Sequence, residues 1–566
     1  MDASLIILED GLCFAEPAST IRADRPEEVP HALAAMATAL AEGRYLAGYF
    51  AYELGYALEP RLAPLMPPKR RTPLLWFGVF DRPATPPPPE GRAYAGPLCT
   101  EWDKATYAAH FTRIRDYIAA GDIYQANLSF RGFFSFAGDA LALYRTLEAR
   151  SGAGHSAFVD DGERQLLSLS PELFFDISPG GALTARPMKG TAPRGADAAR
   201  DVAARAALAA SEKNRAENLM IVDLLRNDLS RIARLGSVGV RDLFAVETYP
   251  TLHTMVSTVT ATLKLETSIA QIVKAIFPCG SVTGAPKIRA MQVISEAESS
   301  PRGVYCGAIG HFSPDGAARF NVAIRTLTIR DGQGELGIGG AVVQDSGMEE
   351  EYAECLLKAR FFTDAYRPLE LIETLKFEEG FARLDRHLAR LENSARVFSL
   401  PFDRPPAIAA LDNAVAGRAG PLRVRLTLGT DGFTCIAVAL PETKAPWRYA
   451  ISPHRISSTD ELQRHKTSWR ELYESEYARL HESGADEVIF LNERGELAEA
   501  SRSNIFLRRK GKLWTPPLSS GALPGCLRRE LLDTAACTEA VLTPADLDSG
   551  TLFFGNSLRG LIAAAR

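Results

Sequence analysis

A break in pattern near Pro368 most constrains how this chain of 566 residues can fold. Residues 348–365 place apolar and acidic side chains at helical spacing. Proline ends such a helix, because it has no N–H and disfavours helical backbone in the residue before it. The next segment, LELIETLKF, has leucine and phenylalanine at alternate positions, as a strand does. We therefore predict two domains, residues 1–368 and 369–566, and the length is sufficient for two hydrophobic cores.

Both domains mix helix and strand patterns. In the first, apolar residues repeat at helical spacing from Tyr107 to Ile118, and Gly121 ends that helix. A longer helix with an apolar stripe that includes Leu219 is predicted over residues 211–235. Short strand-like runs such as FNVAIRTLTI and ELGIGGAVV lie among the helices. Because helices and strands do not alternate strictly, the pattern favours an α+β fold over a doubly wound parallel sheet.

The segment 83–97 is the one compositionally biased stretch. It contains four consecutive prolines, which cannot donate backbone hydrogen bonds to a helix or a sheet. We therefore predict an exposed, semi-rigid loop.

Composition excludes several classes of function. The 64 basic and 69 acidic residues leave a net charge of −5, which provides no basic surface for nucleic acid. No apolar run reaches the roughly 18 residues that a membrane span needs, and Glu9 and Asp10 interrupt the place of a signal peptide. The eight cysteines form no CxxC pair, so neither a disulfide framework nor a zinc site is predicted. We expect a soluble, cytoplasmic protein that acts on small molecules, without a nucleic-acid or membrane partner.

Several charged residues could form a site, but each also has an ordinary explanation. Glu351, Glu354 and Lys358 share one helix face, and such charged stripes are usually solvated. Glu217 by itself is an acidic residue in the first turns of a helix. The segment 280–287, GSVTGAPK, lacks the spacing of a nucleotide-binding loop. It still gathers backbone N–H groups, a hydroxyl and a cation, which suit a carboxylate ligand.

Ten segments of the first half resemble the chorismate-utilising enzymes in the order of that family. The family includes anthranilate, aminodeoxychorismate, isochorismate and salicylate synthases. The segments are IYQANLSF, SLSPELFF, RPMKGTAPRG, ENLMIVDLLRNDL, TLHTMVS, GSVTGAPK, RGVYCGAIG, FNVAIRT, IGGAVVQDS and EYAECLLKA. The resemblance implies a β-sandwich-like domain, flanked by helices, that binds chorismate.

The resemblance also implies roles for individual residues. Glu217 and Glu354, with Glu351 as an additional ligand, match carboxylates that hold Mg²⁺ against the ring carboxylate of the substrate. Glu172 matches the acid that protonates the departing C4 hydroxyl. The other substrate-binding or site-lining positions that the resemblance implies are Gln125, His253, Thr283, Tyr305, Arg325, Gly339, Gly340 and Lys358.

Position 189 separates the members of this family. Anthranilate synthases carry a small residue where this chain has Lys189. Aminodeoxychorismate synthases carry a lysine that attacks ring C2 and expels the C4 hydroxyl before ammonia adds at C4. Gln125 agrees with this assignment, because isochorismate and salicylate synthases tend to have lysine there. The implied product is 4-amino-4-deoxychorismate, and the absence of a glutaminase-like segment implies a separate glutamine amidotransferase subunit or free ammonia.

From residue 369 the chain resembles the class IV pyridoxal-phosphate enzymes, which include branched-chain and D-amino-acid aminotransferases and aminodeoxychorismate lyase. The resemblance implies a fold of two subdomains and allows a homodimer through this domain. Lys466 matches the lysine that binds the cofactor and moves the substrate proton, and Glu499 matches the acid bonded to the pyridine nitrogen. The other implied cofactor-binding positions are Arg390, Asn504, Cys526, Leu527 and Ser557.

The two resemblances together imply a bifunctional enzyme that makes 4-aminobenzoate, a folate precursor. The first half would form 4-amino-4-deoxychorismate, and the second would eliminate pyruvate from it. Two departures keep alternatives open. The opening hairpin of stand-alone class IV members is missing before LIETLKF, so either the first half supplies that edge or the second half is a non-catalytic module. No residue was found that specifies the substrate, so an aminotransferase is the other alternative.

Overall fold

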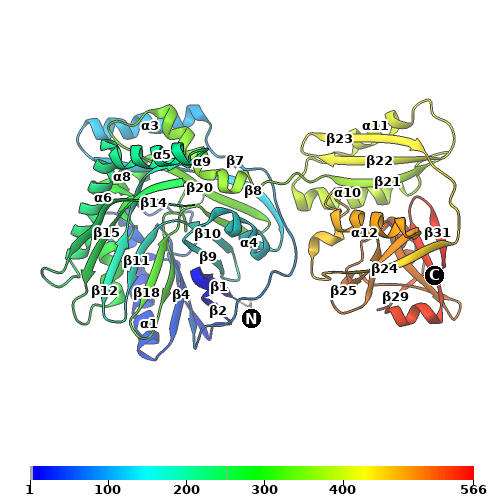
Figure 1. Ribbon diagram of the computed structural model, residues 1–566, viewed down its shortest axis with the longest axis horizontal. Coiled ribbons are helices and arrows are strands. Elements are labelled where there is room, and N and C mark those ends of the chain that lie inside the picture. Colours follow the sequence, from blue (N-terminus) through cyan, green and yellow to red (C-terminus); the bar gives the residue numbers. More distant parts are fainter. Residues whose placement is uncertain (1–3, 250–251, 566) are drawn as a thin grey trace. The chain divides into compact units, whose positions relative to one another are not determined.

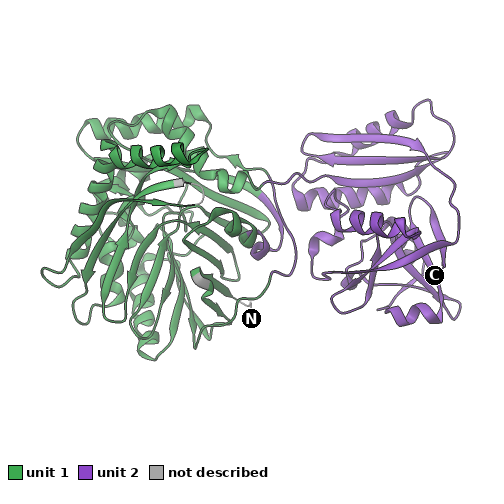
Figure 2. Ribbon diagram, in the orientation of Figure 1, with its two compact units in different colours: residues 1–88, 97–134, 144–365 green, residues 89–96, 135–143, 366–566 purple. Residues whose placement is uncertain are grey.

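The computed structural model describes residues 4–249 and 252–565, and the chain forms two compact units (Figure 2). Unit 1 contains residues 1–88, 97–134 and 144–365. Unit 2 contains residues 89–96, 135–143 and 366–566. The division near residue 366 lies close to the predicted boundary at Pro368, but two short segments of the first half fold with unit 2. No helix among the described residues is long and apolar enough to cross a membrane.

Unit 1 contains two large sheets that pack on each other. Buried side chains of both sheets, such as Ile6 and Val159 from one and Tyr49 and Trp76 from the other, share one core cluster. The predicted sandwich-like α+β fold is therefore confirmed. The first sheet follows the order β16 (Gly284–Ala285), β8 (Gln125–Gly138), β20 (Gln333–Val342), β19 (Thr326–Arg330), β10 (Gln165–Ser170), β9 (His155–Asp160), β1 (Leu5–Leu8) and β2 (Cys13–Ala15), and β7 (Cys99–Thr100) also pairs with β8. The second follows the order β13 (Met188–Pro193), β15 (Leu252–Thr262), β12 (Ala182–Arg186), β11 (Leu173–Ile177), β18 (Ala318–Val322), β17 (Ala308–Phe312), β4 (Tyr45–Phe50), β5 (Leu75–Phe80) and β3 (Ser19–Ala23), with β14 (Gly239–Thr248) beside β15.

Helices cover the sheets of unit 1, and several gather at the top of the view in Figure 1. The predicted helix between Tyr107 and Gly121 is confirmed as α3, whose four apolar positions are all buried. The predicted helix 211–235 is α6, but it ends at Ser230, and Leu219 is 44% exposed because it lies on the outer side. The helices of this half are α1 (Val29–Ala41), α2 (Leu54–Leu58), α3 (Lys104–Ala119), α4 (Ala140–Ser151), α5 (Ala198–Ala210), α6 (Glu212–Ser230), α7 (Ile269–Ile276), α8 (Lys287–Ala297) and α9 (Met348–Thr363).

Unit 2 has two subdomains, as the sequence predicted. The smaller is a three-stranded antiparallel sheet, β21 (Leu371–Phe377), β22 (Leu422–Gly429) and β23 (Gly432–Ala439), which packs with α10 (Leu384–Phe398) and α11 (Arg404–Val415) around one core. The larger is an eight-stranded mixed sheet in which β24 is parallel to both β25 and β31. Its strands and helices are β26 (Leu497–Ala500), β25 (Glu487–Asn492), β24 (Trp447–Ile456), β31 (Gly560–Ala565), β30 (Thr551–Asn556), β27 (Asn504–Arg509), β28 (Lys512–Thr515), β29 (Thr538–Glu539), α12 (Glu471–Glu482) and α13 (Cys526–Asp533).

Two separate segments from the first half of the sequence, residues 89–96 and 135–143, belong to unit 2. Strand β6 (Ala93–Ala95) in the first is antiparallel to the end of β8 in the second, with Tyr94 opposite Ala137. Tyr94 is only 1% exposed and lies in the same core cluster as Phe398. The prediction of an exposed loop is therefore wrong for β6, because strand pairing and an aromatic contact order that segment.

Candidate active sites

A cavity of about 230 Å³ in unit 1 gathers most of the first-half residues that the sequence singled out. Its walls come from β13, β20, α6, α9 and the short turn that follows Gly280. The predicted residues that line it are Glu172, Lys189, Glu217, Tyr305, Arg325, Gly339, Glu351, Glu354 and Lys358.

Ser281 connects the two residues predicted to act on the substrate. Its backbone oxygen accepts a hydrogen bond from Lys189 Nζ at 3.0 Å, and its hydroxyl donates to Glu172 Oε1 at 2.7 Å. Burial lowers the pKa of Lys189, although Glu217 and Glu172 oppose the shift. Burial raises the pKa of Glu172, although Ser281 and Lys189 oppose it. A lysine that loses its proton readily and a carboxyl that keeps its own are what a nucleophile and a general acid require.

Three carboxylates predicted to hold a metal line the same cavity. Burial raises the pKa values of Glu217 and Glu351. Burial acts the same way on Glu354, but Lys358 at 3.0 Å outweighs it and the pKa of Glu354 is lowered. The three do not form a group whose oxygens all lie within 4.8 Å of one another in the described part of the chain. Mg²⁺ commonly uses one or two carboxylates with waters and substrate oxygens, so this donor set fits it.

The basic side chains in the cavity, Lys358 and Arg325, suit a substrate carboxylate. Lys358 Nζ donates to Gly339 O at 3.1 Å, and a Cβ on Gly340 would lie 3.6 Å from the same nitrogen. Arg325 lines the cavity, and burial alone lowers its pKa, without a charged neighbour that offsets the shift. A buried guanidinium without a charged partner favours binding of an anion.

Four expected substrate-binding residues lie outside the lining of this cavity, namely Gln125, His253, Thr283 and Gly340. Thr283 Oγ1 donates to Cys279 O at 2.8 Å, and His253 Nε2 lies 3.0 Å from Asp201 Oδ1. Gln125 is fully buried, and within the described residues neither atom of its amide has a hydrogen-bond partner. Their role in binding substrate stays a prediction.

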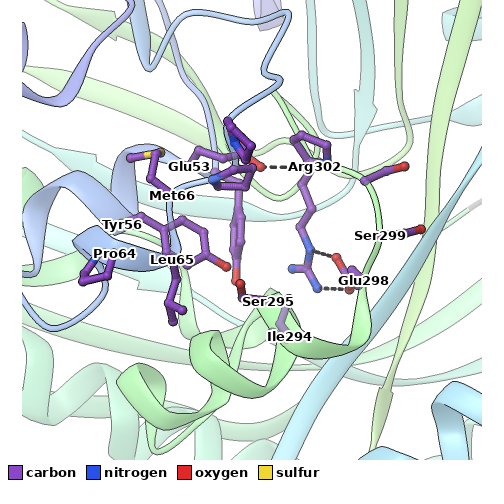
Figure 3. A pocket seen from close by; sticks show the side chains of 15 residues that line it. Glu53, Tyr56, Pro64, Leu65, Met66, Ile294, Ser295, Glu298, Ser299 and Arg302 are labelled. Carbon is purple, nitrogen blue, oxygen red and sulfur yellow. Dashed lines mark hydrogen bonds and ion pairs between the residues drawn. The ribbon is translucent and has the colours of Figure 1, made fainter.

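A separate cavity of about 330 Å³ lies beside α2 and α8 (Figure 3). Arg302 and Glu298 form a buried ion pair there at 2.6 Å, and the backbone N–H of Arg302 donates to Glu53. The Arg302 guanidinium also donates to the carbonyl oxygens of Asn127 and Val282, two residues that line the first cavity. This ion pair therefore supports the wall of the first cavity from behind.

A cavity of about 370 Å³ in unit 2 brings together all the predicted cofactor-binding residues. Burial, and to a lesser degree Arg390, lowers the pKa of Lys466 to about 8, so its amine is poised to react near neutral pH. The residues that line this cavity include Arg390, Lys466, Glu499, Asn504, Cys526, Leu527 and Ser557.

One end of this cavity fits a phosphate group. Glu373 accepts two hydrogen bonds from Arg390, at 2.8 and 2.6 Å, and one ring nitrogen of His387 lies 2.6 Å from it. The other ring nitrogen of His387 lies 2.7 Å from Ser557 Oγ. Although burial opposes it, Arg390 and His387 hold the pKa of Glu373 at about 2. Glu373 orients Arg390 and His387, and with the backbone N–H groups at the start of α13, which has no side-chain cap, Arg390 and Ser557 form an anion-binding cradle.

The other end of the cavity fits a pyridine ring. Glu499 is 6% exposed, and its oxygens accept hydrogen bonds from the Tyr473 hydroxyl and the Leu523 N–H. Burial raises the pKa of Glu499, and a protonated ring nitrogen would supply the cation that stabilises its charge. Asn504 lies against Gly525, where a Cβ would come within 1.9 Å of Asn504 Oδ1. Glycine is therefore required beside this residue.

The sequence did not point to Ser281, Glu373 or His387. Ser281 contacts Lys189 and Glu172, Glu373 contacts Arg390, and His387 links Glu373 to Ser557. Ser281 lies in GSVTGAPK, two residues before Thr283, which was chosen instead. Glu373 lies in LIETLKF, where the alternating pattern indicates only a strand. Both occur inside matching segments, so the signal was present in the sequence.

Comparisons with known proteins match the two halves of the chain to two different families. The model of chorismate binding enzymes matches residues 7–364, and that of class IV aminotransferases matches residues 370–566. An aminodeoxychorismate synthase component 1 from Klebsiella aerogenes is 46% identical over 248 residues, which are 44% of this chain and 55% of that protein. The chain spans about half or less of the length of the curated relatives that it matches first.

Two solved structures are similar to the separate halves. Anthranilate synthase component I from Streptococcus pneumoniae is 25% identical with a TM-score of 0.53, and the match covers 63% of this chain and 89% of that one. A candidate amino-acid aminotransferase from Mesorhizobium loti is 40% identical with a TM-score of 0.34, and the match covers 35% of this chain and 99% of that one. The model of chorismate binding enzymes matches more than half of this chain. The chain therefore belongs to the chorismate binding enzyme family, and a class IV aminotransferase domain follows.

Proposed function

We propose that this chain makes 4-aminobenzoate from chorismate and ammonia in two steps. The observation that carries the proposal is that each unit holds its own cavity with a lysine of lowered pKa at a chemically suitable position. Lys189 and Glu172 line one cavity with three carboxylates, and Lys466 lines the other with the phosphate cradle and Glu499. The intermediate that links the two steps is 4-amino-4-deoxychorismate.

The first step uses Lys189 as nucleophile and Glu172 as acid. The neutral amine of Lys189 attacks ring C2, both ring double bonds shift toward C4, and the C4 hydroxyl leaves as water with the proton of Glu172. Ammonia then adds at C4, both double bonds return, and Lys189 is released from C2 with its bonding electron pair. Glu217 and Glu354 would hold Mg²⁺, which supplies charge stabilisation to the substrate when bound. Arg325 and Lys358 would hold the substrate carboxylates.

The second step eliminates pyruvate and makes the ring aromatic. Pyridoxal phosphate, when bound, supplies an electron sink for this chemistry. Arg390 and Ser557 would hold its phosphate, and Glu499 its ring nitrogen. Lys466 would remove the C4 proton, a task for which a pKa of about 8 is well suited.

The charge of the second cavity favours a substrate with two carboxylates. Its lining includes five arginines besides Arg390, against the carboxylates of Glu474 and Glu499. Arg423 and Arg425 lie two residues apart on β22, so both point to one face of the sheet. 4-Amino-4-deoxychorismate carries two carboxylates, one on the ring and one on the enolpyruvyl group. The five arginines in this lining are Arg423, Arg425, Arg470, Arg502 and Arg559.

The decisive experiment supplies the purified chain with chorismate, Mg²⁺ and ammonium and identifies the products. We expect 4-aminobenzoate and pyruvate in equal amounts. Glutamine should replace ammonium only when a separate glutamine amidotransferase subunit is added. Anthranilate as the product would contradict the first step. Transfer of amino groups to 2-oxo acids without pyruvate release would favour an aminotransferase, a second candidate consistent with the similarity to the Mesorhizobium loti protein.

Replacement of either Glu217 or Glu354 by glutamine should lower chorismate turnover by on the order of 100-fold, because Mg²⁺ loses a charged ligand. The measurement is chorismate loss across a titration of Mg²⁺. Glu212→Gln is the matched control, since it changes an exposed carboxylate in the first turn of α6. A near-normal rate in either variant at limiting Mg²⁺ would disprove the metal assignment.

Replacement of Arg423 or Arg425 by glutamine should raise KM for 4-amino-4-deoxychorismate by about 10- to 100-fold, which is the loss of one charge-assisted hydrogen bond. Absorbance of the bound cofactor should not change, because neither side chain belongs to the phosphate cradle. Arg448→Gln, an exposed arginine of the same unit, provides the control. Unchanged KM in both variants would remove the support for a dicarboxylate substrate.

A further inference from the structure

The segment 89–96, which pairs with residues 135–143, contacts the segment that carries Lys466. These segments all belong to unit 2. The backbone oxygen of Glu90 accepts hydrogen bonds from Ser457 Oγ at 2.8 Å and Thr459 Oγ1 at 3.1 Å. These contacts hold the chain immediately before the Lys466 segment.

Arg92 connects the two ends of that segment, residues 460–469. Its Nε donates to Asp460 Oδ2 at 2.7 Å, and its Nη1 donates to Trp469 O at 3.3 Å. The Asp460 side chain is 4% exposed, and its other oxygen accepts the N–H of Leu462, so Asp460 caps the short helical turn Glu461–Arg464. One guanidinium therefore spans the segment in which Lys466 lies, three residues before Trp469.

Packing reinforces this arrangement. The ring of Tyr94 lies 5.9 Å from that of Trp469 and 5.1 Å from that of Phe398, measured between centroids. The middle of the segment is held from elsewhere, because the backbone oxygen of Lys466 accepts the N–H of Ile372 on β21. Arg92 and Tyr94 therefore hold the two ends of the segment 460–469, and β21 holds its middle at Lys466.

We propose that Arg92 is a positioning residue of the second site, contributed from within the first half of the sequence. It aligns the Lys466 segment so that the amine faces the phosphate cradle and Glu499. The first half thereby contributes contacts to the Lys466 segment, although none of its described strands pairs with β21. This inference rests on the proposed function, because it assumes that Lys466 binds pyridoxal phosphate.

The test uses the full chain with Arg92→Met and Arg92→Lys, titrated with pyridoxal phosphate. Arg92→Met should bind the cofactor about 10- to 100-fold more weakly and shift the pH at which its absorbance band changes, as loss of a supporting contact does elsewhere. Arg92→Lys should recover part of the affinity, because an ammonium can pair with Asp460 but cannot also reach Trp469 O. Arg386→Met is the matched control. The Arg386 side chain is 36% exposed and pairs with Asp533, and the Arg92 side chain is similarly 39% exposed and pairs with Asp460.

Chorismate consumption should be unchanged in each variant, which verifies folding independently of the second step. If Arg92→Met does not fold, Arg92→Lys carries the test. Wild-type affinity and spectrum in both Arg92 variants would overturn this inference, as would equal losses in Arg386→Met. Absence of cofactor binding in the wild type would instead overturn the proposed second step and this inference with it. A double variant with Asp460→Asn should lose less than the sum of the single losses, and additive losses would contradict the contact.

Discussion

The Lys466→Ala variant is expected to stop pyruvate release while chorismate consumption continues at the wild-type rate. Lys466 lies in the cavity of unit 2, and none of its proposed tasks belongs to the first step. Loss of a general base alone costs about 10²- to 10⁴-fold, and loss of the lysine that also binds the cofactor should cost at least as much. Parallel time courses of chorismate and pyruvate measure the effect, and 4-amino-4-deoxychorismate should accumulate.

Two controls define the cause of that loss. Lys512→Ala changes an exposed lysine of the same unit and should release pyruvate normally. Addition of a separate, active aminodeoxychorismate lyase to Lys466→Ala should restore 4-aminobenzoate, because the intermediate can leave the first cavity. If pyruvate appears equally fast in the variant and the wild type, the second unit is not a lyase, and a non-catalytic module becomes the better account.

Lys189→Ala should remove a covalent adduct that intact-mass measurement detects in the wild type with chorismate and without ammonia. Chorismate turnover should fall on the order of 10³-fold, because no other amine replaces the nucleophile. The reaction needs Lys189 neutral, so adduct formation should increase as pH rises through its lowered pKa. It should decrease again as pH rises through the raised pKa of Glu172, which must keep its proton.

Lys213→Ala provides the matched control for the adduct, because Lys213 lines the same cavity but is about half exposed. We expect it to keep the adduct and both limbs of the pH profile. An adduct that persists in Lys189→Ala would show that another group is the nucleophile.

Local patterns predicted the elements whose structure depends on near neighbours in the chain. The spacing from Tyr107 to Ile118 identified α3, because a helix repeats every 3.6 residues whatever surrounds it. The same reasoning located α6 but misplaced Leu219, since periodicity indicates the direction of a side chain and not what covers it. Matching segments predicted the cofactor-binding residues that line the second cavity and most of the site residues that line the first.

The segment around Tyr94 shows where local patterns fail. Its prolines correctly indicate irregular backbone up to residue 88. Strand β6 nevertheless forms, because Ala137 pairs with Tyr94 and Phe398 packs against its ring, and both are distant in sequence. Such contacts depend on where the chain folds back, which no short window contains. Only the fold shows that the segment around Tyr94 belongs to the second unit, and that no described strand of the first half pairs with β21.

The sequence by itself determined the chemical groups that this protein has: two lysines, their partner carboxylates and the positions that resemble two enzyme families. The tertiary structure decided which of these groups share a cavity. It also decided that Ser281 and Glu373 orient them, and that Arg92 reaches the Lys466 segment. The physical reason is that residue type sets what a side chain can do, whereas burial and the contacts of distant residues set its pKa and its orientation.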